Sequence, residues 1–304
     1  MSASYALALK AARDAAGAQH YPQGALYVVA TPIGNLADIS LRALHVLEIA
    51  DAIACEDTRH TQSLLRACGL ERPAGSLLPL HQHNEAEAAQ QVVRRLAAGE
   101  RVAYASDAGT PAISDPGARL VAAVRAAGLR VVPLPGASSV TAVLSVAGAH
   151  AGPAEAGFVF AGFLPSKAGE RATAVEGLAR EPRAVVLLEA PHRIGDLAAA
   201  LAALGPRELT VGRELTKQFE QIATVACADL PAWLAADPQR SRGEFALVLH
   251  PSSAARPADD GQALLALLLE ELPVKSAVRI AAQASGAPRN ALYQAALRLR
   301  GDAS

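Results

Sequence analysis

The sequence has few cysteines, and none of them stands in a pattern that binds metal. Cys55, Cys68 and Cys227 form no CxxC pair and no cysteine/histidine cluster, so the sequence predicts neither a disulfide framework nor a zinc site. His81 and His83 lie close in sequence, but without a third ligand they are more typical of a solvated strand end. We therefore expect no metal ion and a reducing, cytoplasmic setting.

Long apolar runs are also missing. No segment offers the roughly 18 uninterrupted apolar residues that a membrane-spanning helix needs. Residues 1–23 lack the apolar centre of a signal peptide. We expect these residues to form a flexible N-terminal extension of a soluble protein, with room for a short helix.

Neither sign of charge dominates. The chain has 28 Lys and Arg against 29 Asp and Glu, a net charge of −1, which excludes a surface coated with basic residues. Any contact with nucleic acid must therefore come from a local basic patch. The motifs GxGxxG, GxxxxGK[ST], HExxH and GxSxG are absent as well, which removes the usual dinucleotide, P-loop and zinc-protease interpretations.

What is present is an alternation of apolar, strand-like runs with amphipathic segments of helix length. A chain of 304 residues with 51% hydrophobic residues is expected to form two domains. Over residues 24–150 the alternation predicts a mostly parallel α/β sheet. Its strands are expected at 25–30, 51–56, 76–80, 101–105 and 130–134, and its helices at 38–50, 57–69, 84–99 and 118–128.

A second set of runs predicts a mixed α/β domain over residues 151–251, because helices separate only some of its strands. The boundary is expected in the Gly-, Ala- and Pro-rich stretch 148–157. Residues 262–301 predict a small basic helical domain that ends in two helices around a turn, like a helix-turn-helix unit. Strands of the second domain are expected at 157–163, 184–190, 208–215, 221–227 and 243–250.

Four loops of unusual composition follow strands of the first domain, at 31–38, 56–61, 105–117 and 135–142. Ligands of open parallel sheets bind outside the carboxyl ends of the strands, so four such loops at one edge indicate a binding site. In the last loop Ser138 or Ser139 can cap a helix. The first turn of that helix offers backbone N–H groups and a positive dipole end to an anion.

Several motifs, in order along the chain, resemble those of a known family. Over about residues 24–250 the chain resembles the tetrapyrrole methylase superfamily, and within it the enzymes that methylate ribosomal RNA. The tail at 262–300 fits the small C-terminal helical domain of that branch. The motifs are VVATPIGNLADISLRALHVLEIADAIACEDTR, SDAGTPAISDPG, PLPGASSV, LLEAPHR and GRELTKQFE.

The resemblance implies two α/β domains with S-adenosylmethionine bound in the cleft between them. It also implies a homodimer that methylates the ribose 2′-hydroxyl of a cytidine in the decoding region of 16S rRNA, within the 30S subunit. Small residues in the loops would let the main chain touch the cofactor. The cofactor residues implied are Pro32, Gly34, Asp107, Ala108, Gly109, Thr110, Ile113, Ser114, Ser138, Ser139 and Phe163.

Three charged motifs supply candidates for the chemistry. A weakly acidic ribose hydroxyl benefits from a base and from a nearby cation. Glu56 or Asp57 could accept the proton, and Arg59, Arg193 or Lys217 could hold phosphate or stabilise the alkoxide. Each acid could equally form a salt bridge or a helix cap, Asp57 at Thr58 above all, so the base stays undecided. The same motifs contain Glu189, His192, Arg213 and Glu214.

The basic tail is the expected RNA-binding patch. Residues 273–301 hold five basic residues and no acidic one, which suits phosphate binding, although a helix pair that merely packs on the body is the alternative. Tyr293 is expected in the core rather than as a stacking platform. The candidate RNA contacts are Lys167, His192, Arg213, Lys275, Arg279, Arg289 and Arg298.

Two other functions stay open. One is methylation of a tetrapyrrole carbon, against which the basic tail and the charged motifs argue. The other is a non-catalytic rRNA-binding assembly factor that holds the cofactor only as a ligand. One departure from the family concerns Glu220 and Gln221, where members often carry two adjacent acids, followed by a basic stretch. It puts in doubt an RNA contact from residues 216–230, not the cofactor site.

Overall fold

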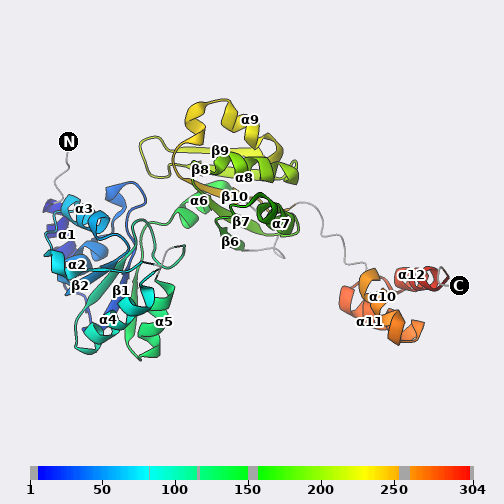
Figure 1. Ribbon diagram of the computed structural model, residues 1–304, viewed down its shortest axis with the longest axis horizontal. Coiled ribbons are helices and arrows are strands. Elements are labelled where there is room, and N and C mark those ends of the chain that lie inside the picture. The colour runs from blue at the N-terminus through cyan, green and yellow to red at the C-terminus, as the bar shows by residue number, and fades with distance from the viewer. Residues whose placement is uncertain (1–5, 82, 115–116, 150–156, 253–260, 302–304) are drawn as a thin grey trace.

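The fold is described from a computed structural model, which covers residues 6–81, 83–114, 117–149, 157–252 and 261–301. It consists of two five-stranded sheets with their helices, followed by a group of three helices (Figure 1). Every strand expected from the sequence is present, with ends shifted by at most two residues. The predicted α/β class is therefore confirmed.

The first sheet is entirely parallel, with strand order β3-β2-β4-β1-β5. Both faces of this sheet are covered by helices. Successive side chains of each strand point to opposite faces, so each strand contributes to two apolar layers. Tyr27 and Ile53 pack under α1, α2 and α3, whereas Leu26 and Tyr104 pack under α4 and α5. The strands are β1 (Ala25–Val29), β2 (Ala52–Cys55), β3 (Leu77–Pro79), β4 (Val102–Ala105) and β5 (Arg130–Leu134), and the helices are α1 (Ala6–Ala16), α2 (Leu41–Ile49), α3 (Thr58–Ala67), α4 (Glu85–Ala97), α5 (Ala118–Ala126) and α6 (Ser139–Ala147).

Helix α1 replaces part of the flexible extension expected at residues 1–23. Leu9, Ala12 and Ala16 share one helical face and are buried. That face packs against α2, and Arg13 forms an ion pair with Glu48 of α2. The segment is ordered because a short apolar stripe at helical spacing suffices when α2 offers a surface to cover.

The second sheet is mixed, with strand order β6-β7-β10-β8-β9. Of the strand pairs described in this sheet, β6 and β7 alone run parallel; β10 runs antiparallel to β7 and β8, and β9 antiparallel to β8. Helices α7, α8 and α9 cover one face. The elements are β6 (Phe158–Gly162), β7 (Ala184–Glu189), β8 (Glu208–Arg213), β9 (Gln221–Ala226), β10 (Phe245–Leu249), α7 (Ala168–Ala179), α8 (Ile194–Leu201) and α9 (Leu230–Ala235).

Helix α6 joins the two sheets. It follows β5 of the first sheet, yet Val140, Val143 and Ala147 pack on the face of the second sheet that α7 to α9 leave free, against Val186 and Val248. The N-terminus of α6 therefore lies where the two domains meet.

The last three helices, α10 (Gln262–Glu271), α11 (Val274–Ser285) and α12 (Arg289–Gly301), have an apolar core of their own. Ala277 and Ala281 of α11 meet Leu292 and Ala296 of α12 in this core. Tyr293 is not part of it: the side chain is 41% exposed, so the core position expected from the sequence is wrong. Within the described residues, no helix combines the length and the apolar character needed to cross a lipid bilayer.

Candidate active site

A cavity of about 250 Å³ lies between the two sheets, at the carboxyl ends of β1, β4 and β5. Three of the four loops singled out in the sequence contribute to it; the loop at 56–61 does not. The second domain closes the other side with the ends of β6 and β7 and the start of the antiparallel β10. The lining residues are Ile33, Ala108, Gly109, Thr110, Ile113, Ser114, Ser138, Ser139, Val140, Phe163, Leu188, Glu189, Ala190, Leu215, Glu244, Phe245 and Ala246.

The loops of the first domain are fixed to one another by the main chain. The Thr31 N–H donates to the Gly109 carbonyl at 2.9 Å, and the Gly109 N–H donates to the Thr31 carbonyl at 3.1 Å. The Thr110 hydroxyl donates to the Ala137 carbonyl at 3.1 Å. Gly109 has φ +82, and a Cβ there would lie 3.2 Å from the Ile33 Cγ2. The geometry of this loop thus calls for glycine, since an L side chain disfavours positive φ.

The N-terminus of α6 opens onto the cavity. Ser138 is the N-cap residue, but its side chain makes no capping hydrogen bond within the described chain, and the Thr141 hydroxyl donates to its carbonyl at 3.2 Å. Ser138, Ser139 and Val140 all line the cavity. The amides of this first turn and the helix dipole therefore favour a negatively charged ligand group.

Most of the implied cofactor residues meet at this cavity. Asp107, Pro32 and Gly34 do not line it. The Asp107 Oδ1 instead accepts the Asp57 N–H at 3.2 Å, and Gly34 lies against the stem of Lys217. Residues 115–116 of the loop lie outside the described residues. The eight that line it are Ala108, Gly109, Thr110, Ile113, Ser114, Ser138, Ser139 and Phe163.

The second-domain wall is the part that sequence reasoning missed. Leu188, Ala190, Leu215 and Phe245 carry no distinctive chemistry. Leu188, Ala190 and Leu215 lie within the motifs LLEAPHR and GRELTKQFE, but it is the pairing of β10 between β7 and β8 that brings them together with Phe245. That pairing joins segments far apart in the sequence, so local pattern could not reveal it.

Asp57 acts as a helix cap. Its Oδ1 accepts the Arg59 N–H at 2.8 Å at the start of α3, and its Oδ2 lies 3.1 Å from the Arg59 guanidinium. These hydrogen bonds to Arg59 hold the pKa of Asp57 below its usual range, which makes it a poor proton acceptor. The Arg59 side chain is 91% exposed, and Glu56 is half-buried.

The EAPHR motif fixes the chain after β7. The Glu189 Oε1 accepts the Ala190 N–H at 2.9 Å and lies 3.2 Å from the Arg193 Nε. The Arg193 guanidinium also donates to the Leu164 carbonyl. The Glu189 side chain is 0% exposed, so its carboxylate does not reach an RNA hydroxyl. His192 is exposed.

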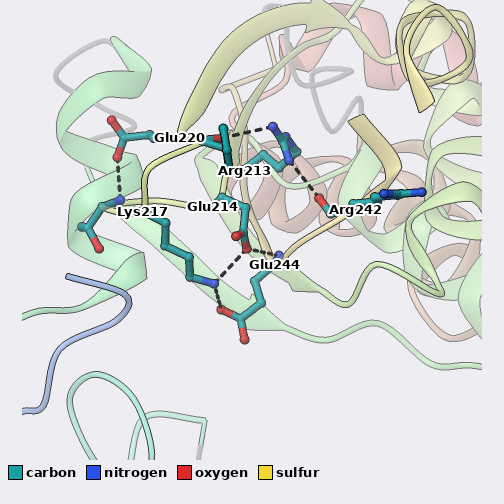
Figure 2. Close-up of polar contacts among 8 residues, drawn as sticks. Arg213, Glu214, Lys217, Glu220, Arg242 and Glu244 are labelled. Carbon is teal, nitrogen blue, oxygen red and sulfur yellow. Dashed lines mark hydrogen bonds and ion pairs between the residues drawn. The ribbon is translucent and has the colours of Figure 1, made fainter. Parts of the chain in front are cut away.

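Arg213 occupies a different position from the one that phosphate binding needs. Its side chain is buried, and its guanidinium donates to the carbonyls of Arg242 at 3.2 Å and Phe219 at 3.1 Å. Figure 2 shows the hydrogen bond from Arg213 to Arg242. The guanidinium is thus engaged by main-chain carbonyls of the β8–β9 loop and of the segment before β10, an arrangement that suits a structural role better than phosphate binding.

Lys217 lies between two carboxylates (Figure 2). Its Nζ is 2.8 Å from the Glu214 Oε1 and 2.9 Å from the Glu244 Oε2. Burial lowers the pKa of Lys217, but hydrogen bonds to Glu214 and Glu244 outweigh it and raise the pKa above its ordinary value. The ammonium is charged but already engaged, so it does not match the expected cation for an alkoxide.

The remaining predicted basic residues are on the surface. Lys275, Arg279, Arg289 and Arg298 are exposed on α11 and α12. Lys167 is exposed at the start of α7, with its Nζ 3.0 Å from the Glu170 Oε1. No group of His, Cys, Asp and Glu in the described residues has the arrangement of a metal site.

Comparison with protein families identifies both parts of the chain. The model for tetrapyrrole (corrin/porphyrin) methylases matches residues 25–231. A second model, described as the RsmI C-terminal HTH domain, matches residues 254–300.

Among curated proteins, the ribosomal RNA small subunit methyltransferase I of Neisseria meningitidis serogroup A is 47% identical over 278 residues, which is 90% of this chain and 93% of that protein. Its counterpart from Xylella fastidiosa strain Temecula1 is 46% identical over 274 residues, 89% of this chain and 98% of that protein.

Among solved structures, cobalt precorrin-4 methyltransferase shares the fold with a TM-score of 0.54 at 18% identity, over 76% of this chain and 98% of that one. Uroporphyrin-III C-methyltransferase from Thermus thermophilus, solved with S-adenosylhomocysteine, has a TM-score of 0.50 at 19% identity, over 73% and 96%. At these identities the likeness shows the fold.

Proposed function

The chain belongs to the tetrapyrrole methylase family, and from this premise we propose that it transfers a methyl group from S-adenosylmethionine to a cytidine 2′-hydroxyl of 16S rRNA. The target lies in the decoding region of the small ribosomal subunit. One observation carries the proposal: relatives named ribosomal RNA small subunit methyltransferase I match about nine tenths of the chain at 46–47% identity, through both the methylase domain and the C-terminal helices.

The cavity fits the methyl donor. The first turn of α6 offers amides to a carboxylate, and Gly109 presents main chain without a side chain to the cavity. Leu188, Leu215 and Phe245 provide an apolar wall for a flat ring. S-adenosylmethionine supplies an activated methyl group bound to a sulfonium. We assign it the eight lining loop residues named above, with Pro32, Gly34 and Asp107 supporting the loops.

Alignment is the main task of the protein in this reaction, because close approach and orientation can contribute about 7–11 kcal/mol. The rigid loops around Thr31 and Gly109 serve this alignment. Of the two candidate proton acceptors, we assign the role to Glu56, since Asp57 caps α3. The exposed Arg59 guanidinium is suited to an RNA phosphate.

RNA binding is assigned to local patches, because the net charge is only −1. Lys275, Arg279, Arg289 and Arg298 project from a helix pair that carries no acidic residue. Lys167 and His192 extend the contact on the second domain, and Arg193 positions the chain beside His192. We further propose a cytoplasmic homodimer acting on the 30S subunit.

Tetrapyrrole C-methylation is the second candidate, since the fold is shared with uroporphyrin and precorrin methyltransferases. The basic helical tail, which matches the RsmI C-terminal domain, disfavours it. A non-catalytic assembly factor is the third.

The decisive experiment incubates the protein and tritiated S-adenosylmethionine with undermodified 30S subunits, with naked 16S rRNA and with a porphyrinoid precursor in parallel. RNA is then digested to nucleosides. We expect label in 2′-O-methylcytidine from 30S subunits. Label in the porphyrinoid, or none despite cofactor binding, would contradict the proposal and favour one of the other two functions.

A further inference from the structure

The loop between β8 and β9, residues 214–220, is unusually constrained. Glu214 and Thr216 have positive φ values of 51 and 67, a conformation that costs free energy for residues other than glycine. Such a conformation persists only where surrounding contacts enforce it. Here the Glu214 N–H donates to the Glu244 carbonyl at 2.9 Å, and the Thr216 N–H donates to the Glu220 Oε2 at 2.6 Å.

The same contacts hold Lys217 in one place. The Glu214 Oε1 accepts from the Lys217 Nζ at 2.8 Å and from the Glu244 N–H at 2.9 Å. Figure 2 shows the Lys217 side chain extending to both carboxylates. Gly243, with φ +83, leaves the space that Glu214 fills: a Cβ there would lie 2.5 Å from the Glu214 Oε1.

The stem of Lys217 contacts the first domain. A Cβ added to Gly34 would overlap the Lys217 Cγ and would lie 3.0 Å from its Cε and 3.2 Å from its Cδ. The preceding residue, Ile33, lines the cavity and packs in the same apolar cluster as Leu215. Two short stretches that are far apart in the sequence, residues 33–34 and 215–217, therefore face each other across the domain boundary.

This contact borders the cavity. Ile33, Leu215 and Glu244 all line it, and Glu244 is one of the two carboxylates that hold Lys217. The position of the first-domain wall relative to the second-domain wall thus depends on how closely Gly34 approaches the Lys217 stem.

We propose that Lys217 is a positioning residue: fixed by Glu214 and Glu244, it sets the separation of the two domains through its contact with Gly34 and thereby shapes the cofactor cavity. The inference rests on the proposed function only for the identity of the ligand. If Lys217 acted on the RNA alone, the effect of a Gly34 substitution on cofactor binding would not depend on the Lys217 side chain.

The test is a double-mutant cycle on the full-length protein, with the Kd for S-adenosylmethionine measured by calorimetry without RNA. Gly34→Ala forces the Lys217 stem aside, and we expect at least about tenfold weaker binding, equivalent to about 1.4 kcal/mol. In the Lys217→Ala background the stem is gone, so Gly34→Ala should cost nothing further. In the Lys217→Met background most of the stem remains, so Gly34→Ala should still weaken cofactor binding.

A second readout needs no ligand. Amide hydrogen exchange over residues 31–38 should be faster in Gly34→Ala and in Lys217→Ala than in the wild type. Gly75→Ala, where a Cβ meets nothing within 4 Å, and Lys10→Ala on the exposed side of α1 are the matched controls, with unchanged Kd and exchange.

Equal costs of Gly34→Ala in the wild-type and Lys217→Ala backgrounds, or no cost in the wild type, would overturn the proposal. If the wild-type protein does not bind S-adenosylmethionine, the proposed function fails, and the exchange measurements still decide the role of Lys217. If it binds the cofactor but methylates no RNA, the cycle stands unaffected.

Discussion

Single residues show how burial controls reactivity. All three cysteines are buried, and burial raises the pKa of the Cys55 and Cys227 thiols to about 11 and also raises the pKa of Cys68. The thiolate is the reactive form. We therefore expect Ellman's reagent at pH 8 to modify no cysteine of the native chain and all three after unfolding in guanidinium. A thiol that reacts rapidly in the native protein would contradict this.

His250 links stability to pH. Its Nε2 lies 2.8 Å from the Thr210 Oγ1; burial, with help from Arg207, lowers the pKa of His250, and Glu208 opposes the shift. The unfolded chain, with a histidine pKa of about 6.5, then takes up a proton before the folded chain does. The contribution of His250 to stability is therefore complete above about pH 6.5 and declines as the pH falls towards the folded pKa.

The measurement is urea unfolding at pH 7.5 and 5.5. The free energy of unfolding should fall less between these values in His250→Gln than in the wild type. His20→Gln, an exposed position, should behave as the wild type. An identical pH dependence in all three proteins would exclude the linkage.

At the scale of secondary structure, two serines at helix N-caps have different roles. The Ser40 hydroxyl accepts the Ala43 N–H at 3.1 Å at the start of α2, whereas the Ser138 side chain makes no capping bond in the described structure. Ser40→Ala should lower the free energy of unfolding by about 1 kcal/mol. Ser138→Ala should change it little and instead weaken binding of S-adenosylmethionine.

Denaturant titration and calorimetry on the two variants check this contrast. A stability loss in Ser138→Ala as large as in Ser40→Ala would mean that Ser138 caps α6 in solution. Unchanged cofactor affinity would remove Ser138 from the site.

At the scale of the whole molecule, the C-terminal helices are a separate unit. Among the residues that the structure describes, their apolar core contains none from the two sheets. Figure 1 shows them as a group beyond the second sheet. Replacing Lys275, Arg279, Arg289 and Arg298 by Gln should leave cofactor affinity unchanged and weaken RNA binding.

The salt dependence of RNA affinity gives the number of lost contacts. The slope of log K against log salt should become shallower by about 0.7 for each phosphate contact removed from a single strand. A slope equal to that of the wild type would show that these four residues make no phosphate contact.

The sequence alone determined the strands, most of the helices and the loops at the edge of the first sheet. These features are local: apolar runs of strand length, amphipathic spacing and turn residues need no distant partner. It also predicted Asp57 at the start of a helix as one of two alternatives, and the capping bond to Arg59 decided between them.

Only the tertiary structure decided which segments of the two domains come together at the cavity. The packing of α6 on the second sheet, the wall formed by Leu188, Leu215 and Phe245, and the burial of Arg213 all depend on strand pairings between distant segments. Charge in the sequence does not reveal whether a side chain is already engaged. Lys217 is a cation in either case, and only the positions of Glu214, Glu244 and Gly34 show where it is held.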